Sequence, residues 1–304
     1  MKKILFDIFT GEDIESVKKF MEENTTGVYF FDDSDISKLI RPRNPAAHKN
    51  VFGHSLIIAG SEGKTGAAIL ASKAALRAGC GLVTSLIPAT AVIPLISVLP
   101  EAMCVVRLDN EAEVTMDLSA FQSIGFGPGV GMQAANMLSH LLRRWQQPLL
   151  IDADGLSLLS RNRDWYHLLT PNMVLTPHPG EFDRLTKPHA SAFERFKTQQ
   201  LFSKTYRVHV LVKGQHTSIT TPTGHVYFNA TGNSGMATAG SGDVLSGIIT
   251  SLLAQEYSTE FAAVVGAYLH GYAGDKAAEE KSKTSMIASD IIEEIPAFFK
   301  QFEK

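Results

Sequence analysis

The sequence predicts an α/β fold, a three-layer α/β/α sandwich in which helices cover both faces of a mostly parallel central sheet. Apolar strand-like runs alternate with helical patterns from about residue 46 onward, and these runs are almost continuously apolar. Parallel strands are buried on both faces, so they have this character, whereas half-exposed strands alternate. One segment differs, because β-rich runs flank Pro222-Thr223-Gly224, and this predicts a β-hairpin over residues 218–228.

Each expected element follows from the length and spacing of its apolar residues. Short runs are typical of buried strands, while longer stretches with apolar residues three or four apart are typical of helices. The expected strands are 54–59, 82–87, 123–126, 149–152, 173–176 and 208–212. The expected helices are 67–78, 133–145, one that begins near Asp243, 261–278 and 289–299.

Length and composition suit a globular protein with a substantial core. The chain has 304 residues, of which 44% are hydrophobic and 19% charged. The first forty residues are more acidic than the rest and lack the glycine-rich loops found later in the chain. The composition of a linker follows in Arg41-Pro42-Arg43-Asn44-Pro45. We therefore expect an N-terminal extension and linker over residues 1–45 and the main domain over residues 46–304.

Charge and hydropathy exclude several classes of function. A formal net charge of -3 and a pI near 6.4, with no basic run, give no general attraction for nucleic acid or an anionic membrane. We find no apolar run near the roughly 18 residues that span a bilayer and expect a cytoplasmic protein. Cys80 and Cys104 lie in apolar surroundings without metal-site spacing, so buried thiols are expected.

The segment 229–243 predicts an anion site. Its last glycines flank Ser241 at the point where an apolar helix begins, so Gly240, Ser241 and Gly242 offer amides that have no partner earlier in the helix. These amides and the positive end of the helix dipole favour a phosphate oxygen. Asp243 follows in the same turn, and it either caps the helix or acts as a base on a group that meets the phosphate.

Two further glycine-rich loops connect an expected strand to an expected helix. Residues 60–66 look like a P-loop, but Ile58 stands where the motif needs its first glycine. This loop is either a plain tight turn or a place where Gly66 and Ala67 approach a ligand. In residues 125–131, glycines around Pro128 leave bare backbone for a ligand or another loop to touch.

Polar groups follow three other strands. Asp152 and Asp154 either bind Mg²⁺ through water or orient a neighbouring loop, and helix capping is the alternative for Asp154. In residues 176–181, we expect His178 to hydrogen-bond a substrate and Glu181 to lie near phosphate or metal, with a capping pair as the alternative. Lys213 and Gly214 end a buried strand and fit a nucleotide phosphate, or they form a surface turn.

Taken in order, these motifs resemble the ADP/ATP-dependent NAD(P)H-hydrate dehydratase family, a branch of the ribokinase-like fold. The resemblance covers roughly residues 48–299 and rests on the following stretches: His48-Lys49, GSEGKTGAA, GPGVG, IDADGL, LTPHPGEF, VLVKGQHT and NATGNSGMATAGSGDVLSG. It implies a dehydratase domain that uses ADP or ATP, escorted by Mg²⁺, to repair the S-epimer of hydrated NADH or NADPH and release phosphate.

The resemblance also implies roles for particular residues. Asp243 would be the catalytic group and would also touch the substrate. Ala67, Gly129 and His178 would line the site of the hydrated nicotinamide. The nucleotide would contact Gly242 and the KGQHT stretch, which consists of Lys213, Gly214, Gln215, His216 and Thr217, and we add Gly240 and Ser241 from the anion-site argument.

The sequence departs from the family at two places. Ala230 stands where many relatives have proline, which would loosen the approach to the catalytic loop without changing its chemistry. Many relatives also carry an N-terminal epimerase domain, and residues 1–45 are too short to form one. We therefore expect either a separately encoded epimerase or spontaneous epimerisation of the substrate.

Three questions remain open from the sequence. The closest rival is a small-molecule kinase of the same fold, of the hydroxyethylthiazole kinase type, and a second is a nucleotide sensor without turnover. Asp243 argues against a sensor, because a binder gains little from a carboxylate that faces phosphate. We also expect a homo-oligomer, in which the apolar helical face of residues 261–269 is either core or subunit interface.

Overall fold

The computed structural model describes residues 8–108 and 116–302. Residues 1–7 of the expected extension, and residues 109–115 and 303–304 of the expected main domain, lie outside the described residues. Within the described part, one ten-stranded sheet runs in the order β1-β10-β9-β8-β7-β6-β5-β2-β3-β4. Its strands are β1 (Gly27–Phe30), β2 (His54–Ile58), β3 (Leu82–Pro88), β4 (Met103–Arg107), β5 (Ser123–Phe126), β6 (Leu149–Ile151), β7 (Met173–Leu175), β8 (His209–Val212), β9 (Ser218–Thr220) and β10 (His225–Phe228).

The sheet is mostly parallel, as the sequence predicts. Strand β9 runs antiparallel to both of its neighbours, and the other strand pairs of the described sheet are parallel. The turn between β9 and β10 contains Pro222-Thr223-Gly224, so the predicted hairpin is confirmed.

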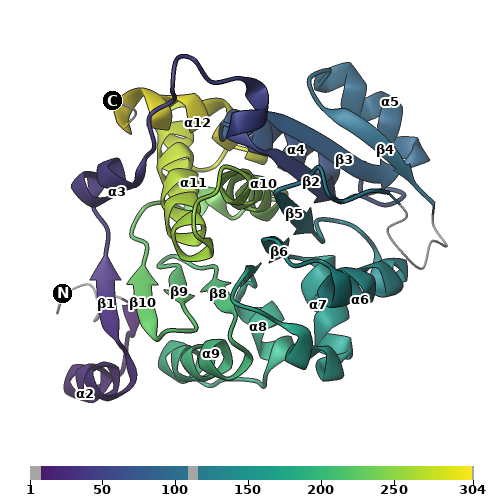
Figure 1. Ribbon diagram of the computed structural model, residues 1–304. Coiled ribbons are helices and arrows are strands. Elements are labelled where there is room, and N and C mark those ends of the chain that lie inside the picture. Colours follow the sequence, from purple (N-terminus) through teal and green to yellow (C-terminus); the bar gives the residue numbers. More distant parts are fainter. Residues whose placement is uncertain (1–7, 109–115, 303–304) are drawn as a thin grey trace.

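Helices cover both faces of the sheet and make three layers (Figure 1). One face carries α3 (Asp33–Leu39), α4 (Thr65–Arg77), α5 (Ala89–Val98), α10 (Ser241–Ala254), α11 (Thr259–Lys281) and α12 (Ala288–Phe302). The other carries α2 (Ile14–Asn24), α6 (Ala135–Arg144), α7 (Asp154–Arg161), α8 (Pro179–Leu185) and α9 (Ala192–Tyr206).

Strand β6 shows why its residues are all apolar. Leu150 packs into the core that contains α10 and α11, while Leu149 and Ile151 pack into the core on the opposite face. Successive side chains of a strand point to opposite faces, so a strand between two helical layers needs apolar residues at every position. Burial of these apolar side chains stabilises the packing of both helical layers on the sheet, and the free energy gained is roughly 25 cal/mol per Å² of apolar surface removed from water.

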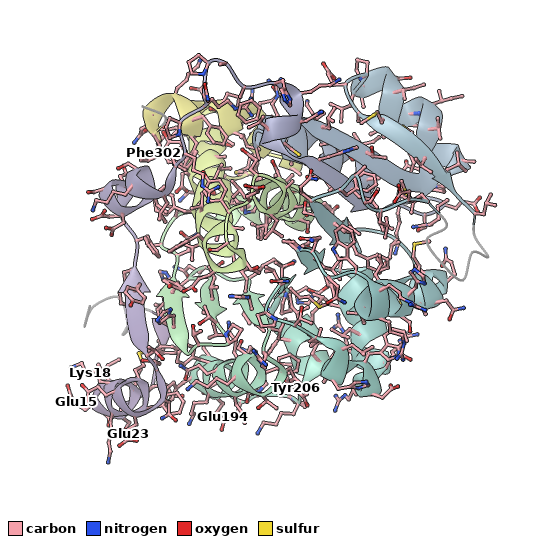
Figure 2. All side chains as sticks on the ribbon, viewed as in Figure 1. Glu15, Lys18, Glu23, Glu194, Tyr206 and Phe302 are labelled. Atoms are coloured by element: carbon pink, nitrogen blue, oxygen red, sulfur yellow. The ribbon has the colours of Figure 1, made fainter. Side chains whose placement is uncertain are left out.

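The N-terminal segment packs against this sheet. Residues Gly27–Phe30 pair in parallel with β10 and form one edge. In α2, Val17 and Met21 are buried, while Glu15 and Glu23 project away from the protein (Figure 2). The expected linker is also held, since the Arg41 guanidinium donates to the Gln255 and Glu256 carbonyls at 3.1 and 3.2 Å.

The apolar face of residues 261–269 belongs to the core. Between Ala262 and Leu269 the side chains of α11 are buried within the protein, and only Phe261 at its start is partly exposed. Across the described part of the chain, no helix combines the length and the apolar character needed to cross a bilayer.

Candidate active site

The loops after five neighbouring strands meet at the carboxyl edge of the sheet. Gly60 N donates to Pro128 O at 2.8 Å, which ties the loop after β2 to the loop after β5. Lys213 N donates to Pro177 O at 2.8 Å, which ties the loop after β8 to the loop after β7. Ligands of open α/β sheets bind at this edge, so the predicted motifs converge on one site.

Helix α10 begins at this edge with free amides. Its N-cap is Gly240, whose φ of +87° lies in the left-handed region, and a β-carbon there would overlap Leu70. No side chain caps the helix, so the capping interpretation of Asp243 is wrong. Ser241 N donates to Thr238 O at 3.4 Å, so the Gly242 and Asp243 amides are the ones in this turn that stay available for an anion.

A buried ion pair lies beneath this turn. Asp152, only 1% exposed, accepts from Lys213 Nζ at 2.8 Å and from the Ser246 hydroxyl at 2.6 Å. A β-carbon on Gly242 would lie 3.3 Å from Lys213 Nζ, so the ammonium sits directly against the start of α10. Asp152 thus holds the Lys213 charge at the place where a phosphate would meet the helix amides.

Asp154 orients a neighbouring loop. Its Oδ2 accepts from Gly131 N at 3.0 Å and from Lys64 Nζ at 3.1 Å. Helix α7 has Ala153 as its N-cap and no side-chain cap, so the capping alternative for Asp154 is wrong. Asp154 therefore links the GPGVG loop to the loop after β2.

Asp243 sits where its charge is disfavoured. Burial, and then the negative charge of Asp152, raise its pKa to about 6; the Lys213 cation opposes this rise, and the Asp154 charge adds to it. A carboxylate with such a pKa is a far better base near neutral pH than an ordinary aspartate. Asp243 therefore feels the charges of Asp152, Lys213 and Asp154, which follow strands β6 and β8.

Two residues predicted to line the substrate site are neighbours. Gly129 has a φ of +59°, and a β-carbon there would lie 3.1 Å from the β-carbons of both Ala67 and Lys64.

Arg107, at the end of β4, holds the two loops that meet at this contact. It is buried and donates to Gly60 O at 2.7 Å and Val130 O at 3.1 Å. Arg107 was not among the predicted site residues, because the strand that it ends was not predicted.

His178 and Glu181 form a capping box at the start of α8. His178 Nδ1 accepts from Gly180 N at 3.1 Å and Glu181 N at 3.3 Å, while Glu181 Oε2 accepts from His178 N at 2.8 Å. The alternative prediction, that His178 and Glu181 form a capping pair, is therefore confirmed. His178 also lines the cavity described next. Among the described residues no group of three His, Cys, Asp or Glu side chains is placed to hold a metal, and the metal roles of Asp154 and Glu181 remain predictions.

A cavity of about 960 Å³ opens beside the start of α10. This volume lies in the range of small-molecule sites. Its lining contains these residues predicted from the sequence: His178, Lys213, Gly214, Gln215, Thr217, Ser241 and Gly242. Ala67, Gly129, Gly240 and Asp243 lie outside the lining, as does His216, whose buried Nδ1 has no hydrogen-bond partner among the described residues.

The wall opposite Lys213 comes from α11, which the sequence did not mark as functional. Asp275 accepts from Gly232 N at 2.8 Å and from the Asn233 side chain at 2.9 Å, and Thr231 Oγ1 donates to Tyr268 O at 3.1 Å. These bonds fix the loop of residues 229–234 on the helix. His270 of α11 reaches the cavity too, with Nε2 3.3 Å from the Ser241 hydroxyl.

The order of the strands, and the likeness to a ribokinase-like superfamily protein of Enterococcus faecalis (27% identity, TM-score 0.80, 91% of this chain and 97% of that one), place this chain in the ribokinase-like class of α/β proteins. The family model described as NAD(P)H-hydrate dehydratase matches residues 55–297, and the chain belongs to that family.

Relatives of known name agree with this assignment. The bifunctional NAD(P)H-hydrate repair enzyme Nnr of Moorella thermoacetica is 38% identical over 279 residues, which cover 86% of this chain and 52% of that protein. The chain thus spans about half the length of this relative. The ADP-dependent (S)-NAD(P)H-hydrate dehydratase of Neisseria meningitidis is 36% identical over 78% of this chain and 81% of its own length. The ADP/ATP-dependent dehydratase of Bacillus subtilis, co-crystallised with ATP/Mg²⁺, superposes with a TM-score of 0.79 at 26% identity, covering 91% of this chain and 100% of that one.

Proposed function

We propose that this protein dehydrates the S-epimer of hydrated NADH or NADPH at the expense of ADP or ATP, a metabolite-repair reaction of the hydro-lyase class. The observation that carries the proposal is Asp243, a carboxylate with a pKa raised to about 6 in the first turn of a helix whose amides are open to an anion. Membership of the NAD(P)H-hydrate dehydratase family supports it, as do the names of the relatives.

The nucleotide occupies the cavity beside α10. Its terminal phosphate lies against the open amides at the start of α10 and against Lys213, and the rest of it follows the Lys213–Thr217 stretch. Lys213 is suited to this role because Asp152 already holds its ammonium beside Gly242, so little ordering is needed when phosphate arrives. The cavity volume and the residues predicted for the nucleotide support this placement.

The hydrated nicotinamide lies on the other side of Asp243, against Ala67 and Gly129 and within reach of His178. Asp243 takes the proton of the C6 hydroxyl while that oxygen attacks the terminal phosphorus, and AMP or ADP leaves. The C6–O bond then breaks, phosphate departs with the bonding pair, and C5 gives up a proton as the ring double bond forms. Phosphorylation thereby converts hydroxide, a poor leaving group, into phosphate.

Magnesium supplies positive charge to the phosphates during such a transfer. Asp152 is engaged with Lys213, Asp154 with Lys64 and Glu181 with the α8 backbone. These three carboxylates thus have partners of their own. We propose that Mg²⁺ arrives with the nucleotide and is held mainly by phosphate oxygens and water.

The decisive experiment incubates the protein and Mg²⁺ with hydrated NADH and either ADP or ATP. We expect the absorbance of reduced nicotinamide to return in step with release of free phosphate. A stable phosphorylated product would instead identify a small-molecule kinase, and binding of nucleotide without phosphate release would identify a sensor. The two nucleotides, and the hydrates of NADH and NADPH, are compared in parallel to find the preferred pair.

Two partners are part of the proposal. The Moorella relative is bifunctional and about twice as long as the matched region, and we propose that an epimerase activity supplies the S-epimer to this domain when the R-epimer accumulates. We also propose a homo-oligomer, which light scattering coupled to size exclusion would test.

A further inference from the structure

His270 lines the cavity, yet the proposed chemistry gives it no task. It lies in the middle of α11, and its Nε2 is 3.3 Å from the hydroxyl of Ser241, the first residue of α10. Ser241 is itself only 7% exposed and lines the same cavity. A partly buried polar contact between two helices at the edge of this cavity indicates a role beyond packing.

The surroundings keep His270 neutral. Burial is the main cause and lowers its pKa to about 4; the Ser241 backbone opposes this shift, and the Lys213 cation adds to it. A neutral imidazole has one nitrogen that donates and one that accepts. The Ser241 hydroxyl has a single proton, so the tautomer of His270 decides where that proton points.

The two tautomers have opposite effects on the anion site. If Nε2 accepts, the Ser241 proton is used in the bond to His270, and the serine oxygen turns its lone pairs toward the cavity. If Nε2 carries a proton, it donates to Ser241 Oγ, and the serine proton becomes available to a phosphate oxygen. Only the second arrangement adds a donor to the helix amides and Lys213.

We propose that His270 is a positioning residue for the nucleotide: its Nε2–H donates to Ser241 and thereby directs the serine hydroxyl proton onto the phosphate. This inference rests on the proposed nucleotide site. Binding of phosphate selects the Nε2–H tautomer, because only that tautomer leaves the Ser241 proton free for the ligand. Neighbours on α11 make the placement rigid, since Asp275 and Gly274 hold Asn233 and Gly232 in the adjoining loop.

A double-mutant cycle on ADP binding tests this arrangement. We expect Ser241→Ala and His270→Ala each to weaken ADP about tenfold, the effect of one hydrogen bond to a charged group. The double variant should be no weaker than either single variant, because His270 acts only through Ser241. His270→Gln keeps a side-chain N–H donor and should restore most of the affinity. Additive losses, about a hundredfold in the double variant, would overturn the proposal.

The tautomer gives a second and independent reading. In protein labelled with ¹⁵N-histidine, the signal missing from His270→Gln identifies His270, and addition of ADP should move its Nε2 to the protonated, donating form. An Nε2 that stays unprotonated with ADP bound would also overturn the proposal.

Tyr272→Phe is the matched control on the same helix. The Tyr272 hydroxyl bonds to Gln301 of α12, away from the cavity, so this variant should bind ADP like wild type. Wild-type turnover of the hydrate is followed in parallel. If ADP binds without turnover, the proposed dehydration fails, whereas an additive cycle in a working enzyme removes only the role of His270.

Discussion

Asp152 and Lys213, 61 residues apart in the chain, form an ion pair of 2.8 Å between the ends of β6 and β8. The carboxylate is almost fully buried, while the ammonium keeps contact with the cavity. Asp152 therefore does two things: it fixes the cation that would meet phosphate, and its negative charge helps raise the pKa of Asp243. The two effects are separable by experiment.

Replacing Asp152 by asparagine should move the acid limb of the pH profile. Asp243 must be ionised to accept a proton, so with a pKa of about 6 activity falls as the pH drops below that value. Asp152→Asn removes one of the negative charges that raise this pKa, so the limb should shift to lower pH, although kcat falls because Lys213 loses its anchor. The measurement is kcat/KM for the hydrate between about pH 5 and 8.

Ser246→Ala is the control for that shift. It removes the hydroxyl that donates to Asp152 at 2.6 Å but keeps both charges. The acid limb should stay close to that of wild type. A limb that moves to higher pH in Asp152→Asn would contradict the assigned role of the Asp152 charge.

Replacing Asp243 by asparagine should abolish turnover while stabilising the fold. Loss of the base lowers kcat by about 100- to 10,000-fold. The folded-state pKa of about 6 lies above the ordinary value of 3.8, so ionised Asp243 opposes folding, and this penalty grows as pH rises from about 4 to 6. At pH 8 the variant should unfold at a higher temperature than wild type, and its free energy of unfolding should be higher by at most about 3 kcal/mol. This gain in stability should vanish near pH 4.

Asp183→Asn is the control of opposite sign. Burial tends to raise the pKa of Asp183, but hydrogen bonds from Arg195 and His189 outweigh it, and the pKa is lowered overall. Its ionised form therefore stabilises the fold above the unfolded pKa, and the variant should be less stable than wild type at pH 8. Equal stability of wild type and Asp243→Asn across the whole pH range would rule out the electrostatic account of Asp243.

The buried strands were predicted from the sequence, whereas the edges of the sheet were not. Strand β6 lies between two helical layers, so its continuous apolar run is sufficient evidence. Strand β4 lies at the edge, where Met103 and Val106 are 43% and 44% exposed, and it was not predicted although residues 102–106 are apolar throughout. The hairpin was predictable because proline and glycine mark its turn.

The site divides in the same way. Loops that bring bare backbone to a ligand need glycine and proline, so the motifs around Gly129 and Gly242 are visible in the sequence. His270 sits within an apolar helix pattern, and nothing local distinguishes it from a core residue. The pKa of Asp243 depends first on burial and then on the charges of Asp152 and Lys213, and only the folded protein supplies that burial and brings these charges together.

Two glycines of the α10 turn should respond differently to alanine. At Gly242, a β-carbon would lie 3.3 Å from Lys213 Nζ, in the space between the ammonium and the helix amides. Gly242→Ala should weaken ADP binding at least tenfold with little change in stability. At Gly240, the left-handed φ and the overlap with Leu70 make alanine strained. Gly240→Ala should therefore lower the free energy of unfolding by about 1 kcal/mol or more, and the melting temperature with it. Calorimetric titration with ADP and thermal unfolding separate the two effects, and equal loss of stability in both variants would refute the distinction.

Arg107 should matter for the hydrate and not for the nucleotide. Its guanidinium donates to Gly60 O and Val130 O, which belong to the two loops that bring Ala67 against Gly129. Arg107→Met removes both donors and leaves buried carbonyls unsatisfied, so the loops should separate and the KM for hydrated NADH should rise about tenfold. The Kd for ADP should change little, because the cavity beside α10 is lined by other loops. Lys73→Met is the matched control, since its ammonium pairs with Glu293 of α12 and contacts neither loop. General loss of structure in Arg107→Met would weaken ADP and hydrate together, and that result would contradict a role confined to the substrate loops.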